Sequence, residues 1–416
     1  MPNGYEGKNI MLNKNRKKKK ILYYESGSGF GGSAVSLYRL VKYLDKELFR
    51  PYVFVHGVGP RIEEIKKMNV SVDRLKLYHP IPAINDTSPG FLTSIFENFS
   101  FYINFCINTI VNTFIFCKTI KRNNIDLVHL NNGIFENFPA LIASKFCGIP
   151  CISHVRGTEP VTRIEKVFGK WVKKIITLNS RMYNLYKSLF GADKACIVFN
   201  GVDLEAFENV DKDKLRRDYQ VPQDNFLIGT IARLVPGKGI PEYIKAAAEV
   251  IKDNKKATFF VIGDDPLLDQ SFENDLKKMC SKLGLNGHVI FTGWRDDVID
   301  LMAGLDLVVQ FSTFPEGMSL TPIEAMALSK PVITSNVPGY TDTVEHGVTG
   351  FIVPAGDIHV LSKRILEISM NRMNRDFGYT LGKNGRKKVE TEFDVKNTVS
   401  RVQEIYKKVL NGQKRS

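Results

Sequence analysis

Short apolar runs alternate along this chain with longer stretches in which apolar residues recur at helical spacing. The runs are rich in Val, Ile, Leu and Phe, which is typical of strands, and the stretches between them predict amphipathic helices. The runs predict strands at 21–26, 52–57, 126–130, 150–155, 174–179, 196–200, 226–232, 257–263, 288–293, 306–311, 331–335 and 350–354. Strands that alternate with helices build parallel sheets from right-handed βαβ units, so the sequence predicts an α/β fold.

The strand–helix scheme begins again at Asp224, which indicates two similar Rossmann-like domains. A chain of 416 residues is also too long for one ordinary core. We expect a basic, disordered tail at 1–20, a first domain at 21–210 and a second domain at 211–389. The remaining segment, 390–416, is predicted to be a charged amphipathic helix that can cross back to the first domain.

The two halves of the chain differ in charge. Residues 1–200 carry 29 Lys and Arg against 14 Asp and Glu, whereas residues 201–416 carry 29 against 30. A basic half indicates an anionic partner, such as membrane lipid or nucleic acid. The aromatic-interleaved basic modules of RNA-binding proteins are missing, so we expect peripheral contact with an anionic membrane and no nucleic acid.

Two segments could carry that contact. The segment 91–117 is the most apolar part of the chain, but Asn104, Asn108 and Asn112 recur every four positions and form one polar stripe on a helix. Such a helix can pack on the core, and it can also touch lipid. The segment 162–174 combines five Lys and Arg with aromatic residues, a composition found on ordinary solvated helices as well as at membrane interfaces.

The cysteines and the first apolar run bear on where the protein works. Six cysteines are scattered without paired metal spacing, which is typical of reduced thiols in a cytosolic protein. The run ILYY after the basic tail is shorter than the roughly seven apolar residues that a signal peptide requires. We therefore expect a cytoplasmic protein that can lie peripherally on the inner face of the cell membrane.

The strongest chemical signal is FSTFPEGMSLTPIEAMALSKPVIT at 311–334. A predicted strand ends there in a loop that feeds a helix near Thr321, and such a helix start offers unpaired N–H groups to an anionic ligand. Glu316 and Glu324 cannot bind phosphate and would instead accept hydrogen bonds from hydroxyl groups, which indicates a sugar–phosphate ligand. Alternatively, TPIE is a capping box with Thr321 as N-cap, and Glu324 serves only the helix.

A second loop, GTIARLVPGKG at 229–239, presents Arg233 and Lys238 after another predicted strand. In an open α/β sheet, cations at the carboxyl end of a strand lie where ligands bind. Two solvated surface cations would show the same pattern.

Arg-x4-Lys followed by Glu-Gly-x6-Glu resembles the retaining GT-B glycosyltransferases of the "glycosyl transferases group 1" (GT4) family. The resemblance runs through the second domain in GTIARLVPGKGI, VIGDD, FTGWRDDV, FPEGMSLTPIEAMALSKPVITSNVPGY and GVTGFIVPAGD. In the first domain it is looser but collinear, in GSGFGGSAVSL, DLVHL and FNGVD. It implies a GT-B fold, in which two Rossmann-like domains face each other across a cleft.

The resemblance also implies residue roles in the second domain. Arg233 and Lys238 would bind the donor diphosphate and neutralise the charge that develops on the leaving group, and Glu324 would bind the ribose hydroxyls. Glu316 would hold the transferred sugar together with the donor-binding loop Gly317, Met318, Ser319 and Leu320. Relatives usually carry glycine near Ser329, and the serine here puts the C-cap of the preceding helix in doubt.

In the first domain, Gly31 and Gly32 open a helix that in this family faces the donor phosphates, because glycine permits close backbone approach. A plain turn with Ser33 as N-cap is an equal alternative. His154 matches a histidine near the reacting sugar in relatives, although a lone histidine after a strand is often structural. Arg156 follows it and could contact the acceptor or a phosphate.

The implied function is retaining transfer of a sugar from a UDP- or GDP-sugar to an acceptor hydroxyl, in cell-envelope polysaccharide or lipid-linked glycan synthesis. Cations on the phosphates would remove the need for a metal, and GDD at 263–265 is not spaced as the Asp-x-Asp metal motif, so we expect no metal and no cofactor. The alternatives are a basic nucleic-acid-binding protein and a non-catalytic sugar-nucleotide-binding protein of the same fold.

Overall fold

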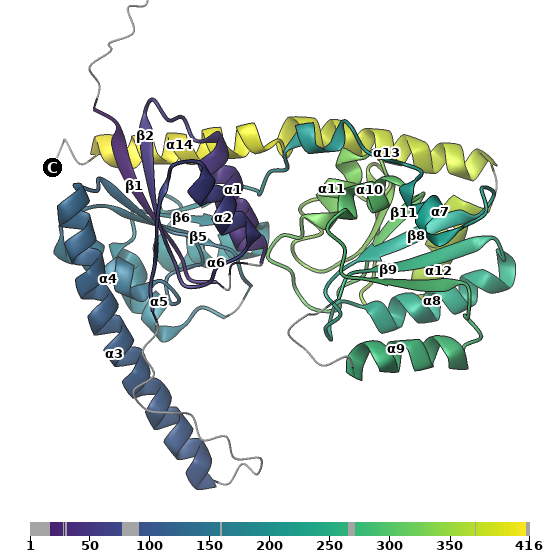
Figure 1. Ribbon diagram of the computed structural model, residues 1–416, viewed down its shortest axis with the longest axis horizontal. Coiled ribbons are helices and arrows are strands. Elements are labelled where there is room, and N and C mark those ends of the chain that lie inside the picture. Colours follow the sequence, from purple (N-terminus) through teal and green to yellow (C-terminus); the bar gives the residue numbers. More distant parts are fainter. Residues whose placement is uncertain are drawn as a thin grey trace, which may run out of the picture.

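The protein consists of two α/β domains that lie side by side, with helix α13 (Arg372–Glu392) along the second domain and helix α14 (Val395–Gly412) along the first (Figure 1). The computed structural model describes residues 17–27, 29, 31–76, 91–158, 160–264, 271–370 and 372–412. Most of the predicted basic tail and Asp265 of the GDD motif lie outside these residues.

The first domain is built on a seven-stranded parallel sheet with the order β3-β2-β1-β4-β5-β6-β7. Its strands are β1 (Lys19–Glu25), β2 (Phe49–Val55), β3 (Ser71–Arg74), β4 (Leu127–Leu130), β5 (Cys151–Val155), β6 (Lys174–Thr177) and β7 (Ala195–Ile197). Six of them fall on the predicted runs. The sequence pattern missed β3, because this mostly exposed edge strand reads SVDR and carries a single apolar residue.

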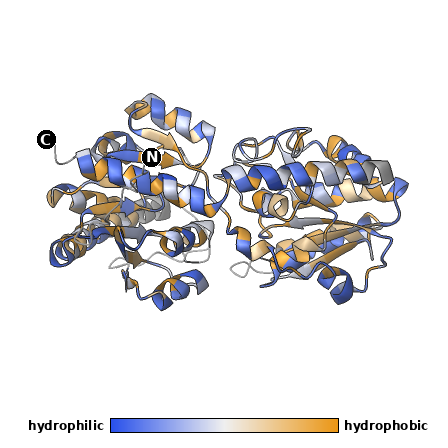
Figure 2. Cartoon of the chain, turned by 90° about the horizontal axis from the view of Figure 1, so that it is seen from above, coloured by the Kyte–Doolittle hydropathy of each residue, from blue (hydrophilic) through white to orange (hydrophobic). Residues whose placement is uncertain are grey.

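Helices cover both faces of this sheet, as the alternation of buried side chains requires. They are α1 (Gly32–Tyr43), α2 (Pro60–Lys67), α3 (Phe91–Asn123), α4 (Phe138–Phe146), α5 (Arg163–Phe168) and α6 (Ser180–Phe190). Ile21 and Tyr23 of β1 pack with α1 and α2, whereas Leu22 and Tyr24 pack with α3 and α4. Figure 2 shows the apolar positions gathered on the strands inside each domain.

The second domain repeats this plan with a six-stranded parallel sheet in the order β10-β9-β8-β11-β12-β13. The strands are β8 (Phe226–Ile231), β9 (Ala257–Ile262), β10 (Val289–Gly293), β11 (Leu307–Gln310), β12 (Val332–Ser335) and β13 (Gly350–Val353). The helices around it are α7 (Lys214–Tyr219), α8 (Ile240–Asp253), α9 (Ser271–Lys282), α10 (Val298–Ala303), α11 (Thr321–Ala327), α12 (Ile358–Ser369) and α13 (Arg372–Glu392).

Helix α14 (Val395–Gly412) returns from the second domain to the first, as expected from the sequence (Figure 1). Val399, Val402 and Tyr406 are buried in the core formed by β1, α1 and α2. The two crossings of the chain touch each other, since the Val202 N–H donates to the Phe393 carbonyl (2.8 Å) and the Val395 N–H donates to the Val202 carbonyl (3.0 Å).

The basic segment 162–174 is not one continuous helix. Helix α5 ends at Phe168, a short 3-10 turn follows at Gly169–Trp171, and β6 already begins at Lys174. Trp171 is partly buried with its ring against Phe168 (4.8 Å between ring centroids). The basic residues of this segment therefore do not share one helix face.

Candidate active site between the domains

Two loops at the carboxyl end of the second sheet lie side by side. One follows β8 and the other follows β11, its neighbour in the sheet. The Thr313 N–H donates to the Gly237 carbonyl (2.9 Å), and a side chain at position 239 would overlap the Phe311 carbonyl. Gly239 also has φ of +72°, a conformation that favours glycine. This close approach brings the predicted cation of one loop to the predicted carboxylate of the other.

Lys238 and Glu316 form that contact, with Nζ and Oε1 2.6 Å apart. Oε1 of Glu316 also accepts a hydrogen bond from Oγ of Ser312 (2.6 Å). Ser312 in turn lies 3.1 Å from the hydroxyl of Tyr340, whose pKa is raised by burial so that it stays protonated. Both charged side chains keep some exposure, 28% for Lys238 and 18% for Glu316, so the pair is held in place and remains accessible.

Glu324 lies in the first turn of α11 and pairs across the domain boundary. Its Oε1 is 3.3 Å from a guanidinium nitrogen of Arg39 on α1, and Arg39 also donates to the Gly201 carbonyl (3.0 Å). The capping-box interpretation is wrong: the N-cap is Leu320, without a side-chain cap bond, and Thr321 is already helical. With no capping role, the Glu324 carboxylate is available to a ligand or to Arg39.

The loop of Gly317, Met318, Ser319 and Leu320 before α11 forms part of the contact between the domains. A side chain at Gly317 would overlap the Arg156 carbonyl of the first domain. The Gly317 carbonyl accepts a hydrogen bond from Asn179 (2.7 Å), and the sulfur of Met318 accepts one from the Asn200 N–H (3.2 Å). Met318 is therefore buried against the first domain, and its side chain does not line an open cleft.

Arg233 lies in the same region but in a different setting. It follows β8 by two positions and is exposed, whereas Lys238 is partly buried. Its role at the diphosphate stays a prediction.

The glycine loop of the first domain is held by a carboxylate that the sequence pattern did not reveal. Gly31 is the N-cap of α1, and the space beside Gly32 is open. Glu25, at the end of β1, is fully buried and accepts hydrogen bonds from the Gly27 N–H (2.9 Å) and the Ser33 hydroxyl (3.0 Å). The alternative in which Ser33 caps the helix is therefore wrong.

Glu25 also ties this loop to the neighbouring strand. It accepts hydrogen bonds from the side-chain amides of Asn131 and Asn132, which follow β4 directly. The only sequence signal for this cluster was the pair of asparagines after the run DLVHL.

Two family models match this chain, one on each domain. The model described as "Glycosyltransferase Family 4" matches residues 30–206, and the model described as "Glycosyl transferases group 1" matches residues 211–388. The chain belongs to the glycosyl transferases group 1 family and is a GT-B glycosyltransferase. The predicted family and fold class are thereby confirmed.

Curated relatives of this glycosyltransferase include enzymes named for cell-surface glycans. It is 33% identical over 239 residues to the capsular polysaccharide biosynthesis glycosyltransferase CapM of Staphylococcus aureus, which covers 57% of this chain and 59% of the relative. It is 25% identical over 311 residues to an Escherichia coli UDP-Gal:alpha-D-GlcNAc-diphosphoundecaprenol alpha-1,3-galactosyltransferase, covering 70% and 77%. The match thus spans less than two thirds of the first relative's length.

Solved structures share the fold over nearly the whole chain. A glycosyltransferase from Rickettsia africae superposes with a TM-score of 0.80 at 20% identity, covering 95% of this chain and 99% of that one. Anabaena HepE in complex with UDP superposes with a TM-score of 0.74 at 22% identity, covering 94% and 100%.

In this glycosyltransferase His154 is buried and uncharged. Burial, with the nearby Arg156 guanidinium, lowers its pKa well below the usual range. Arg156 donates to Nδ1 (3.3 Å), which places the ring proton on Nε2, and Nε2 has no hydrogen-bond partner within the described residues. His154 lines a hollow of about 20 Å³ together with Asn200 and with residues of α1 and α14. Among the described contacts, no hydrogen bond joins His154 to the Lys238–Glu316 pair.

Arg156 holds the end of the first sheet together. Its guanidinium donates to the Asn131 carbonyl (2.8 Å) and to the Asn200 side-chain oxygen (2.9 Å). Burial lowers the pKa of Arg156 to about 10, so it stays charged at neutral pH. Its side chain is engaged within the first domain, while its carbonyl meets Gly317.

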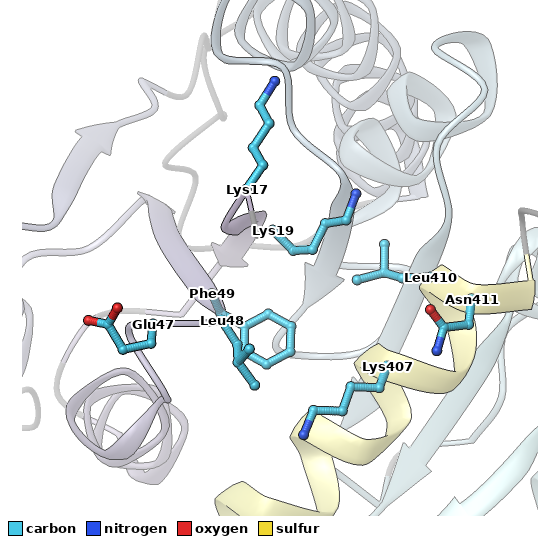
Figure 3. A pocket seen from close by; sticks show the side chains of 8 residues that line it. All are labelled: Lys17, Lys19, Glu47, Leu48, Phe49, Lys407, Leu410 and Asn411. Atoms are coloured by element: carbon cyan, nitrogen blue, oxygen red, sulfur yellow. The ribbon is translucent and has the colours of Figure 1, made fainter. Parts of the chain in front are cut away.

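A second hollow, of about 360 Å³, lies at the amino ends of the strands of the first sheet, away from the second domain's loops (Figure 3). Lys19 and Phe49, which begin β1 and β2, line it with Lys407 and Leu410 of α14. It faces the amino ends of the strands, whereas ligands of open α/β sheets bind beyond the carboxyl ends. The interdomain region is therefore the better candidate for the active site.

Proposed function

We propose that this glycosyltransferase moves a sugar from a UDP- or GDP-sugar to an acceptor hydroxyl with retention of anomeric configuration. The observation that carries the proposal is the Lys238–Glu316 pair at the edge of the second domain, with Glu324 one helix turn beyond the same loop. Cation and carboxylates side by side suit a ligand that is both phosphate and polyhydroxyl.

Each group has a distinct task in this proposal. Lys238, assisted by Arg233, binds the donor diphosphate and offsets the negative charge that grows as the glycosidic bond breaks. A preorganised charge of this kind contributes about 10²–10³-fold to the rate. Glu316, oriented by Ser312, accepts hydrogen bonds from the sugar hydroxyls. Glu324 exchanges Arg39 for the ribose hydroxyls.

The reaction requires no enzyme nucleophile. The bond between the anomeric carbon and the diphosphate oxygen breaks, and the acceptor oxygen forms its bond to the same face of the sugar. The acceptor proton passes to the leaving phosphate oxygen, which acts as the base. No metal ion and no cofactor take part in this proposal, since Lys238 and Arg233 supply the positive charge.

The relatives support the donor and acceptor classes. Solved structures of HepE are titled as complexes with UDP and with UDP-glucose, and the Escherichia coli relative is named for a diphosphoundecaprenol-linked acceptor. We therefore place the protein in cell-envelope polysaccharide or lipid-linked glycan synthesis. The first domain, which carries the excess of basic residues, would hold the acceptor in the cytoplasm, next to the membrane.

The test is a panel of UDP-, GDP- and ADP-sugars. We expect one donor to raise the melting temperature and to be hydrolysed slowly, with the freed sugar retaining its anomeric configuration by NMR. A nucleic-acid-binding protein would instead ignore the whole panel and bind oligonucleotides with an affinity that falls steeply with salt. A non-catalytic relative would show the thermal shift without hydrolysis or transfer to any acceptor.

A further inference from the structure

Helix α3 exposes a row of apolar side chains to solvent, while Phe116 and Ile120 near its carboxyl end pack in the core of the first domain. Between Ser100 and Asn123 the helix is long enough and apolar enough to cross a membrane, by length and composition alone. Only 17% of its most apolar window is buried within the protein. Figure 1 shows it leaving the first domain and extending away from the body of the molecule.

The exposed side of α3 is a continuous outer stripe, defined as Tyr102, Cys106, Ile110 and Phe114. These residues are spaced by four and so lie on one side of the helix. Ile110 is 69% exposed and Phe114 is 79% exposed. A contiguous row of exposed apolar side chains indicates an interaction surface, whereas single exposed apolar residues are ordinary.

The asparagines lie on the other side. Asn104, Asn108 and Asn112 are each two positions from a residue of the outer stripe, which is about 200° around the helix. Asn112 is buried, and the Asn108 amide donates to the Asn104 carbonyl (2.7 Å). The polar stripe predicted from the sequence therefore lies opposite the outer stripe, and at intervals of four it continues into Phe116 and Ile120, which pack in the core.

Basic residues continue the outer stripe at its carboxyl end. Lys118 and Arg122 follow Phe114 at intervals of four, and Lys121 lies beside them; all three are exposed. At the end of the adjacent α4, Phe146 is 75% exposed next to Lys145. Cys147, one residue further, contacts Cys117, which places this corner beside the basic end of α3.

We propose that α3 lies in the surface of an anionic bilayer, with the outer stripe in the acyl boundary and Lys118, Lys121 and Arg122 at the headgroups. Apolar side chains flanked by Lys and Arg on one helix side suit that position, and each basic residue near an anionic surface contributes about 1 kcal/mol. A second copy of the chain would instead bring two basic surfaces together. Complete insertion is also excluded, because Phe116 and Ile120 are fixed in the domain core.

Vesicle flotation tests this inference. With phosphatidylcholine vesicles that contain phosphatidylglycerol, we expect the full chain to float and its binding to weaken with salt. Ile110→Ser/Phe114→Ser should bind at least tenfold more weakly, since both side chains leave the lipid. The matched control, Met370→Ser/Tyr379→Ser, removes exposed apolar residues from the second domain and should bind as the wild type does.

A polarity-sensitive fluorophore on Cys106 gives a second measurement, with labelled Cys106→Ser protein as the blank. We expect a blue shift on the anionic vesicles and none on pure phosphatidylcholine. Equal flotation of the wild type and the Ile110/Phe114 variant, or a variant that changes only the oligomeric state in gel filtration, would overturn the inference. None of these measurements uses turnover, so the proposed function can fail while this inference stands, and the reverse.

Discussion

The two domains share one topology but place their polar residues differently. In the second domain, Lys238 and Glu316 lie in loops after the strands and keep some exposure. In the first domain, Glu25, His129 and His154 are buried beneath the ends of the strands and bond to their neighbours. In the proposed function, the second domain presents these groups to the donor, whereas the first uses buried polar groups to position loops. Substitutions should therefore reduce turnover in one domain and stability in the other.

The largest effect is expected at Lys238. Lys238→Ala should lower turnover at least tenfold, and by about 10²–10³-fold if the lysine supplies a full preorganised charge. Its melting temperature should stay close to that of the wild type, because a partly exposed ion pair contributes little to stability. Lys245→Ala, an exposed lysine on α8, is the control, and wild-type turnover in Lys238→Ala would sink the diphosphate assignment.

The second effect concerns Glu324, whose carboxylate pairs with Arg39 of the first domain. Glu324→Gln should weaken nucleoside diphosphate binding about tenfold or more, as loss of a charge-assisted hydrogen bond does. The Arg39→Ala protein should bind the nucleoside diphosphate at least as tightly as the wild type does, because the substitution releases the Glu324 carboxylate.

Lys42→Ala is the control for Arg39→Ala, since Lys42 also lies on α1 but pairs with Asp203 (2.6 Å) and not with Glu324. Calorimetric titration measures all three variants. A Glu324→Gln protein with undiminished affinity would leave Glu324 as an interdomain contact only.

The third prediction concerns how the stability of the first domain depends on pH. Burial lowers the pKa of His129 to about 3 and that of His154 well below its usual range, so both are neutral in the folded protein. The unfolded chain takes up these protons below about pH 6.5. Stability is therefore complete above that pH and falls as the pH drops toward 3, by up to about 1.4 kcal/mol per pH unit for each histidine.

His129→Gln should show a shallower loss of unfolding free energy between pH 6.5 and 5 in urea titrations, as follows from one fewer proton taken up on unfolding. His359→Gln, at an exposed position, should keep the wild-type slope. If the slopes of the three proteins coincide, the buried histidines do not control the acid sensitivity.

The smallest effect is expected at Ser329, at the end of α11. Ser329 has φ of +57°, and the Lys330 N–H donates to the Ala325 carbonyl (2.9 Å), so the helix ends in a left-handed cap without the usual residue. Ser329→Gly should stabilise the protein by about 0.5–1 kcal/mol. Ser281→Gly, near the end of α9, should destabilise it slightly, and a loss of stability in Ser329→Gly would contradict the strain argument.

Periodicity and turn residues sufficed to predict every described strand except β3, because apolar runs such as ATFFVI are buried on both faces. They did not predict β3, whose edge position needs no apolar run. The loop residues of the candidate site were also found from the sequence, since Lys238 and Glu316 stand where neighbouring parallel strands end.

The sequence could not predict which distant segments contact each other. Arg39 and Glu324 are 285 positions apart, and nothing local marks Arg39 as a partner. The capping box failed for a related reason: TPIE suits a helix start, but the chain enters α11 one residue earlier and leaves Glu324 free to reach α1. The asparagine stripe of α3 was visible in the sequence, but its direction depends on what the helix packs against.

The return of α14 has a consequence for how the protein is made. The Tyr406 hydroxyl donates to the Tyr23 hydroxyl (3.1 Å) and lies 2.6 Å from Nδ1 of His129, although Tyr23 and Tyr406 are 383 positions apart. On a ribosome, the first domain emerges well before the residue that fills its core. The domain synthesised first is thus the last to be completed. Until α14 is synthesised, the apolar side chains of β1 and α1 that α14 covers stay exposed.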